Sequence, residues 1–376
     1  DARQTETIKE VPTMNVAAAV YAATIQRART KGIRRGVRTS VKLLFDLKTL
    51  VELVSILNGP NTIAFARRHP GVIYKCQGRY LAKGISRRHR KTILKFHYQF
   101  IEKSVNSQFY RRLISGNVEL WRSAEAGPTI KISLSVPEYG REGDLSLILT
   151  IDSNQIYELS FTIIPGSVAG VPGSNAIFIA RVQGRKGQFD AIRRATKICR
   201  DVSPPYLLMA AAEGIANAFG IRFVVGVGND DQLSSQKTFD YTSFWETLLC
   251  RKTEGLFYVL PLPILGAPLD QCSPSHRRRT RLKREYKVAL SQAVETAFLR
   301  ELRSSSCNSK RIGEGEGIKS FCYSTARHER QIELQATGPC TFSIKRRHDL
   351  HSSLAESWGH SDGQRSCLQL RSAPTV

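Results

Sequence analysis

The stretch LSLILTIDSNQIYELSFTI, residues 145–163, decides the fold class. Large apolar residues alternate with smaller or polar ones on both sides of Asp152-Ser153-Asn154, and a period of two is typical of strands. A short polar link between two such runs predicts an antiparallel hairpin. A third run with the same alternation lies at 130–136. The pattern therefore favours three antiparallel strands with one covered face.

Downstream of these strands, helices alternate with strands. The expected elements are strands at 176–183, 221–227 and 256–260 and helices near 188–200, 205–219 and 276–303. The two helices between the strands at 176–183 and 221–227 make a right-handed crossover, so these two strands are expected to be parallel. The order of strands is similar to that of the GNAT superfamily of acyl-CoA-dependent N-acyltransferases. The predicted class is α+β, a mixed and mostly antiparallel sheet with a βαβ crossover.

The N-terminal third is predicted to be helical. Apolar residues repeat every three or four positions from Leu43 to Leu57, and a second amphipathic pattern spans 86–104. Residues 1–40 are basic and weakly patterned, which indicates a mobile arm or a solvated helix. The predicted division of the chain is a basic arm at 1–40, a helical region at 41–125, an α/β sheet domain at 126–304 and a tail at 305–376.

The tail at 305–376 differs in kind from the rest of the chain. It holds half of the cysteines and half of the histidines, is rich in serine and arginine, and shows no sustained periodicity. Such a composition indicates a disordered tail or an aberrant reading frame. Both interpretations stay open, and neither suggests a function.

The charge balance points to an anionic partner. Fifty-six lysines and arginines oppose 32 acidic residues, which gives a net charge of +24. An excess of this size is associated with lipid surfaces, phosphorylated ligands or nucleic acid. The eight cysteines contain no C-x2-C pair, so neither a metal site nor a disulfide framework is expected. No apolar run is long enough to predict an integral membrane span.

The turn after the strand at 176–183 is a candidate phosphate site. The free N–H groups of a loop that opens a helix attract anions. The candidate anion-binding residues are Gln183, Gly184, Arg185, Lys186, Gly187, Arg193 and Lys197. The segment 181–186 resembles the R/Q-x-x-G-x-G/A pyrophosphate loop of the GNAT superfamily, but it ends in lysine instead of a small residue. This resemblance implies an acyltransferase with an acyl-CoA cofactor, whereas the alternative is an ordinary turn with solvated basic residues.

A second basic cluster opens the helix at 276–303. Its candidate polyanion-binding residues are Arg277, Arg278, Arg279, Arg281, Lys283 and Arg284. Clustered basic residues beside an amphipathic helix suit anionic lipid headgroups. Nucleic-acid phosphates are another ligand for such a run, although no known nucleic-acid-binding motif is present. A solvated capping segment is the third interpretation.

No signature identifies a reaction. The sequence contains no HExxH, GxSxG, P-loop or paired-carboxylate motif. His97 lies between Ile93 and Ile101 on an apolar helix face, which is more typical of a core histidine than of a general base. The sequence therefore identifies no catalytic residues.

Short motifs follow one another in a characteristic order over residues 42–300. They are Arg67-Arg68-His69-Pro70, Gly78-Arg79-Tyr80-Leu81, His97-Tyr98, Gln183-Gly184, Thr196-Lys197, Phe244-Trp245, Leu260-Pro261 and the basic run that ends at Tyr286. The ordered set resembles the VirK/YbjX family of Gram-negative bacteria.

That resemblance implies a role in virulence, envelope integrity, resistance to cationic antimicrobial peptides or surface display of an outer-membrane protein. It also implies a cytoplasmic protein or one peripheral to the inner membrane. The family has no established catalytic residues or cofactor, so none is carried over. Leu282 and Glu285 depart from the aromatic and basic residues usual in the family at these positions.

Overall fold

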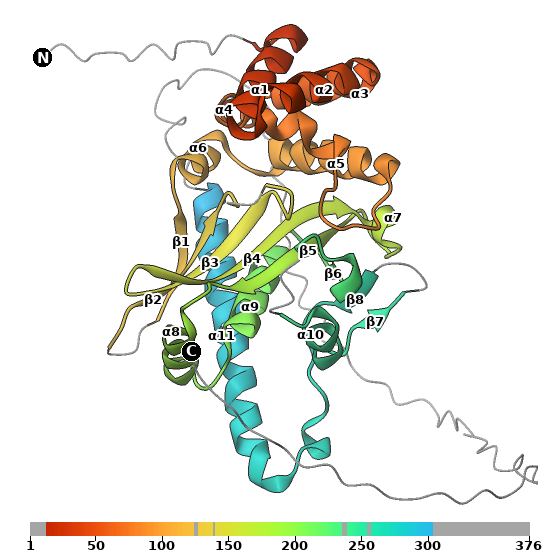
Figure 1. Cartoon of the computed structure of the whole chain (residues 1–376). Coiled ribbons are helices and arrows are strands. Elements are labelled where there is room, and N and C mark those ends of the chain that lie inside the picture. The colour runs from red at the N-terminus through yellow and green to blue at the C-terminus, as the bar shows by residue number, and fades with distance from the viewer. Residues whose placement is uncertain (1–12, 124–126, 138–139, 235–238, 254–256, 304–376) are drawn as a thin grey trace, which may run out of the picture. The chain divides into compact units, whose positions relative to one another are not determined.

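One mixed sheet organises the part of the chain that the structure describes. This computed structural model describes residues 13–123, 127–137, 140–234, 239–253 and 257–303, all within the unit Asp1–Glu314. Its eight described strands have the order β1-β2-β3-β4-β5-β6-β8-β7 (Figure 1). They are β1 Val118–Arg122, β2 Ile130–Ser135, β3 Leu145–Ile151, β4 Asn154–Pro165, β5 Asn175–Gly184, β6 Phe223–Val227, β7 Arg251–Lys252 and β8 Phe257–Pro261.

The predicted strand pairing is confirmed. β2, β3 and β4 are antiparallel, and β5 and β6 form the parallel pair of the crossover. Asp152 and Ser153 have φ angles of 49° and 67°, which make the two-residue turn of the β3–β4 hairpin. The α+β class is therefore correct. β1 was not predicted, and it adds an antiparallel edge strand beside β2.

Helices cover both faces of this sheet. They are α1 Val16–Lys31, α2 Ile33–Leu44, α3 Leu47–Leu57, α4 Ile63–Arg68, the 3-10 helix η1 Pro70–Gln77, α5 Arg87–Ser104, α6 Ser107–Ser115, α7 Gly166–Ala169, α8 Phe189–Ile198, α9 Pro204–Ala218, η2 Asn229–Asp231, α10 Tyr241–Thr247, η3 Leu269–Gln271 and α11 Pro274–Arg303. α9 and the long α11 pack together behind the sheet, and α5 lies on its other face (Figure 1). We call α1–α5 with η1 the helical cap.

α1 and α2 occupy residues for which the sequence indicated a mobile arm or a solvated helix. Ala19 and Ala23 on α1 are buried. The hydroxyls of Thr24 and Ser40 lie 2.5 Å apart, and they are 3.0 and 2.9 Å from the Tyr74 hydroxyl of η1. These contacts tie both helices to η1. The domain boundaries at 40, 125 and 304 stay predictions, and the tail at 305–376 lies outside the described residues.

The sheet face beneath the cap is polar and buried. Its buried polar side chains belong to Ser133, Asp144, Ser146, Glu158, Ser160 and Thr162. Glu158 accepts hydrogen bonds from the hydroxyls of Ser146 and Ser160, at 2.8 and 3.2 Å. The prediction of a single covered face is wrong, because the cap buries the polar positions of the alternating strands and internal hydrogen bonds satisfy them.

Candidate functional site

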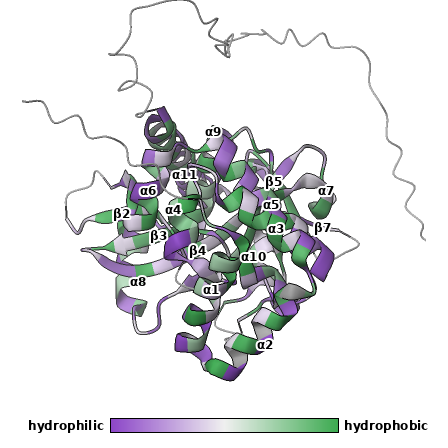
Figure 2. Cartoon of the chain, turned by 90° about the horizontal axis from the view of Figure 1, so that it is seen from above, coloured by the Kyte–Doolittle hydropathy of each residue, from purple (hydrophilic) through white to green (hydrophobic). Residues whose placement is uncertain are grey.

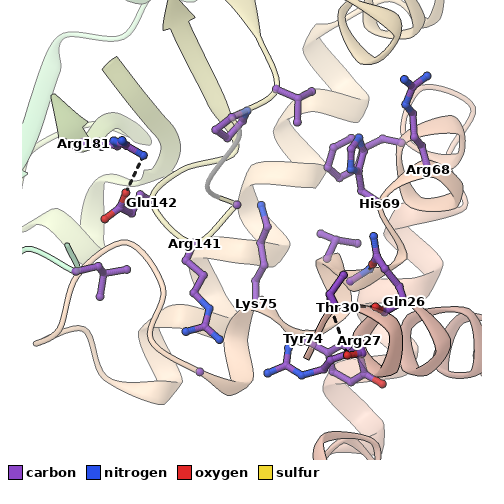
Figure 3. Close-up of a pocket in the computed structure, with 18 of the residues that line it drawn as sticks. Gln26, Arg27, Thr30, Arg68, His69, Tyr74, Lys75, Arg141, Glu142 and Arg181 are labelled. Carbon is purple, nitrogen blue, oxygen red and sulfur yellow. Dashed lines mark hydrogen bonds and ion pairs between the residues drawn. The ribbon is translucent and has the colours of Figure 1, made fainter. Parts of the chain in front are cut away.

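A cavity of about 1170 Å³ lies between the helical cap and the polar face of the sheet. η1 and the end of α1 form one side, the loop after β2 forms another, and Ser135, Arg181 and Gln183 belong to the sheet (Figure 3). The basic residues that line it are Arg27, Lys31, Lys42, Arg68, Lys75, Arg79, Arg141 and Arg181. Glu142 is the one acidic residue among the described lining residues. The cavity is therefore strongly cationic.

Lys75 joins the cavity to a buried carboxylate. Its ammonium nitrogen lies 2.6 Å from Asp144 Oδ1. The Asp144 side chain is 1% exposed, and it also accepts hydrogen bonds from Thr162, Tyr98 and Tyr80, the first two at 2.7 and 3.0 Å. These four donors hold the carboxylate in place and fix the position of the Lys75 ammonium at the cavity wall.

The ionisation states of this cluster follow from burial and charge. Burial alone would raise the pKa of Asp144, but the Lys75 ammonium and the hydrogen bonds from Lys75 and Tyr80 outweigh it and place the pKa well below its usual range. Burial raises the pKa values of Tyr80 and Tyr98 far above normal, so both hydroxyls keep their protons. The cluster at neutral pH is thus a carboxylate that accepts hydrogen bonds from neutral phenols and one ammonium.

Backbone geometry places Asp144 at this point. Gly143, directly before it, has a φ of 149°, and a Cβ there would lie 2.9 Å from the Phe161 nitrogen. The Asp144 N–H donates to the Phe161 carbonyl at 3.0 Å. Only glycine permits so close an approach of the two strands' backbones. Leu81, next to Tyr80, adopts a φ of 65°, a conformation that is costly for a branched side chain and that the surrounding structure must enforce.

His97 lies behind this cluster and is fully buried. Its Nδ1 accepts a hydrogen bond from the Ile163 N–H at 3.3 Å, so the proton of the neutral ring is on Nε2. Within the described residues Nε2 has no hydrogen-bond partner. Burial lowers the pKa of His97 to about 4, against the opposing attraction of Asp144. The ring is neutral at physiological pH and does not line the cavity, in agreement with a core histidine.

Three arginines supply uncompensated charge. Arg68 on α4, Arg79 after η1 and Arg141 before β3 are exposed at the cavity. No ion pair or side-chain hydrogen bond joins them to another described residue. Arg181 differs from them, because its Nη1 lies 3.3 Å from Glu142 Oε2. Free guanidinium groups around one cavity are suited to bind phosphate or carboxylate groups bidentately.

His69 lines the same cavity but contributes no charge at neutral pH. Burial lowers its pKa, and the positive charges of Lys75 and Arg68 lower it further. A neutral imidazole offers one donor and one acceptor to a ligand. It therefore adds hydrogen bonding, while the arginines supply the electrostatic attraction.

The predicted phosphate turn is only partly associated with this cavity. Gln183 lines it, whereas Gly184 to Gly187 do not. The Arg185 N–H already donates to the Ile156 carbonyl at 2.9 Å, and the Gln188 N–H donates to the Arg185 carbonyl at 3.3 Å. Arg193 and Lys197 are exposed on α8, where Arg193 lies 3.9 Å from Asp190. The structure thus brings Gln183 to the cavity and leaves the other six residues on the surface of the turn and helix.

The gap between the parallel strands is filled by the protein itself. β5 and β6 pair only from Ile177 to Ile179 and then separate. The Tyr241 hydroxyl of α10 accepts from the Val182 N–H at 3.1 Å and donates to the Val182 carbonyl at 3.2 Å. Gln232 also donates to this hydroxyl, at 3.1 Å. These backbone groups of β5 are consequently occupied, and the acyl-CoA hypothesis stays a prediction.

The predicted polyanion-binding run lies on the first turns of α11, away from the cavity lining. Arg277, Arg278, Arg279 and Arg281 are exposed, and Lys283 and Arg284 are partly buried. Arg279 pairs with Asp201 at 2.9 Å, Arg277 donates to the Cys272 carbonyl at 3.1 Å, and Arg284 donates to the Ala267 carbonyl. Half of the run is therefore engaged in contacts within the chain.

Sequence reasoning missed the cavity, although two signals for it were present. Arg68 and His69 of one motif and Gly78 and Arg79 of another line the cavity, while Tyr80 reaches Asp144 behind it. These motifs carried the family resemblance without an assigned role. Only the fold shows that they lie together with Gln183.

Two further observations on the described residues concern metal ions and membranes. They contain no cluster of three histidine, cysteine or acidic side chains placed to hold a metal ion. In the same ranges, none of the helices combines the length and the apolar composition needed to cross a bilayer.

Comparison with known proteins relates most of the chain to one family. A family model described as "Protein of unknown function (DUF535)" matches residues 30–294. The uncharacterized protein YbjX of Escherichia coli (strain K12) is 22% identical over 283 residues, which cover 69% of this chain and 84% of that protein. No solved structure matches the chain.

Proposed function

The chain belongs to the VirK/YbjX family, described as DUF535, and we propose that it binds a phosphate-bearing ligand in the cavity between the helical cap and the sheet. The observation that carries this proposal is the charge of the lining. Eight basic residues and one acidic residue line the described part of the cavity, and Arg68, Arg79 and Arg141 have no partner among the described residues. Unpaired guanidinium groups favour an anion with several oxygens.

The size and the polarity of the cavity narrow the class of ligand. Pockets of about 300–1000 Å³ enclose molecules of the size of drugs and cofactors, and this one has about 1170 Å³. Ser135, Ser234, Gln77 and Gln183 add hydroxyl and amide groups to the lining. A ligand that carries hydroxyl groups as well as phosphate, such as a phosphorylated sugar, suits this combination.

The family resemblance suggests where such a ligand is found. Roles in virulence, envelope integrity and resistance to cationic peptides all concern a surface rich in phosphorylated glycolipids. We infer that the ligand is a phosphorylated envelope component or its precursor, which the protein binds from the cytoplasm or the inner membrane surface. We propose binding only and assign no reaction to the cavity.

Calorimetric titration with glucosamine phosphate, glucosamine and inorganic phosphate tests the proposal. We expect the phosphorylated sugar to bind and plain glucosamine to fail. Charged hydrogen bonds contribute about 1.5–3 kcal/mol each, so Arg68→Ala and Arg141→Ala should each weaken binding by about tenfold to a hundredfold. Both side chains are exposed and unpaired within the described residues, so the fold should tolerate their loss.

The double variant Arg193→Ala/Lys197→Ala is the matched control, because it removes two exposed basic residues outside the cavity. Unchanged affinity in this control is expected. If the control weakens binding as much as the cavity variants do, the cavity is not the site and the turn after β5 becomes the better hypothesis. If none of the three probes binds, the proposed class of ligand is wrong.

A further inference from the structure

α2 presents a row of aliphatic side chains to solvent. Ile33, Val37 and Val41 are 74, 53 and 46% exposed, and Phe45, directly after the helix, is 86% exposed. Residues at i, i+4 and i+8 share one stripe of a helix. Figure 2 shows hydrophobic and hydrophilic residues side by side along this helix. An apolar row of this length that no described element covers is unusual on a protein surface.

The row is separate from the side of α2 that packs on the protein. Gly36 and Leu43 are buried, and Ser40 bonds to Thr24 and Tyr74. A Cβ at Gly36 would lie 3.3 Å from Ala28 Cβ, so glycine brings α2 close to α1. Among the described residues, the fold therefore leaves Ile33, Val37 and Val41 largely exposed, and these side chains can contact a partner.

Positive charge borders the apolar row. Each aliphatic residue of the row is followed directly by a basic one: Arg34, Arg38 and Lys42. These three side chains form a neighbouring stripe of the helix, and all are exposed. No salt bridge joins these three to a described acidic residue. The whole segment 14–45 contains seven basic residues and no acidic one. The charge of this surface is thus not neutralised by its own sequence.

We propose that α2 docks on the surface of an anionic lipid bilayer. The aliphatic row and Phe45 enter the headgroup region, while Arg34, Arg38 and Lys42 contact lipid phosphates. An apolar stripe beside a basic stripe is the pattern of helices that lie in a membrane interface. Nucleic acid would leave the aliphatic row unused. A second copy of the chain would bring like charges together, which disfavours self-association through this surface.

This inference goes beyond the proposed ligand site and does not depend on it. The docking surface nevertheless lies next to the cavity. Lys42 on α2 and Lys31 at the end of α1 both line the cavity. A protein docked through α2 would therefore hold the cavity beside the membrane surface. A phosphorylated headgroup would then meet the cavity without leaving the bilayer.

Vesicle co-sedimentation tests the docking surface. The full chain is mixed with vesicles of equal parts phosphatidylcholine and phosphatidylglycerol, and with vesicles of phosphatidylcholine alone. Binding to the anionic vesicles only is expected. Val37→Glu/Val41→Glu should reduce it by at least about tenfold, because both carboxylates would enter the interface. Arg34→Gln/Arg38→Gln should reduce it by about fivefold for each charge removed.

Two controls separate this surface from others. Leu265→Glu changes a leucine outside α2 that is 72% exposed, more than Val37 or Val41, and should leave binding unchanged. Arg278→Gln/Arg281→Gln removes two charges from the exposed run on α11 and should have less effect than Arg34→Gln/Arg38→Gln. Thermal melting confirms that each variant is folded. Arg68→Ala, which weakens ligand binding in the cavity, should retain vesicle binding. The ligand site and the docking surface are therefore tested separately.

Three outcomes would overturn the proposal. Vesicle binding that survives Val37→Glu/Val41→Glu excludes α2 as the docking surface. Binding that depends on the α11 run instead assigns membrane contact to that run. A protein that sediments as a dimer in solution, and becomes a monomer only with Val37→Glu/Val41→Glu, assigns the row to contact between copies.

Discussion

Replacing His97 by asparagine should flatten the acid dependence of stability. His97 is fully buried and its pKa is lowered from 6.5 to about 4. The unfolded chain therefore takes up a proton at this residue in a range of pH where the folded chain does not. Stability from the neutral ring is complete above pH 6.5 and is lost progressively as the pH falls to about 4.

The size of the effect follows from the two pKa values. A tenfold change in proton affinity corresponds to about 1.4 kcal/mol. The drop from 6.5 to about 4 therefore amounts to about 3 kcal/mol of unfolding free energy over that range. Asparagine does not titrate, and its amide oxygen can accept the hydrogen bond that Ile163 donates to Nδ1. The variant loses stability at neutral pH through its smaller volume, but this loss does not depend on pH.

Urea denaturation, followed by tryptophan fluorescence at several pH values from neutral down to 4, measures the unfolding free energy of wild-type and His97→Asn as a function of pH. The difference between wild-type and His97→Asn should shrink by about 3 kcal/mol on acidification. Carboxylates that titrate in both proteins cancel in this difference. His276→Asn, at an exposed position, should give a curve parallel to the wild-type. Parallel curves for wild-type and His97→Asn would refute the assignment of a neutral buried ring.

Two further substitutions test the packing that supports the cavity and the crossover. Asp144→Asn leaves the ammonium of Lys75 without its carboxylate, and denaturation should show a loss of about 3–5 kcal/mol; a loss no larger than that of a surface change would mean that the pair is not formed. Gly226→Ala places a Cβ against the ring of Trp245 and should lower the unfolding free energy by about 1–3 kcal/mol. A Cβ at Gly116 meets only open space, so Gly116→Ala should change the unfolding free energy by less than about 0.5 kcal/mol. Equal losses for Gly226→Ala and Gly116→Ala would contradict the packing of α10 on β6.

The sheet could be predicted because its signals are local. Alternation in 145–163 gave the hairpin, and two helices between apolar strands gave the parallel pair. β1 was missed because Val118–Arg122 contains too few alternating positions to stand out. α2 looked like part of an arm because its packed side uses Gly36 and Ser40, so the helix lacks an inward apolar period.

The cavity could not be predicted because its parts are distant in sequence. Alternating strands have the same pattern whether the polar face meets water or a hydrogen-bonded cap, so the burial of Ser160 and Thr162 left no mark in the sequence. Arg68, Arg79 and Arg141 belong to three segments, and only the packing of the helical cap against the sheet brings them to one cavity. The charge total of +24 indicated an anionic ligand without a position for it.

Three of the four hydrogen bonds to Asp144 cross from the cap region to the sheet and limit how the cap can move; the fourth donor, Thr162, lies on β4. Hydrogen bonds to a buried charge are directional, so a small displacement of the donors weakens them. Lys75, Tyr80 and Tyr98 reach from the cap to Asp144 in the sheet layer. These bonds consequently hold the cap in one position on the sheet. The cavity between the cap and the sheet can widen only if the bonds to Asp144 break.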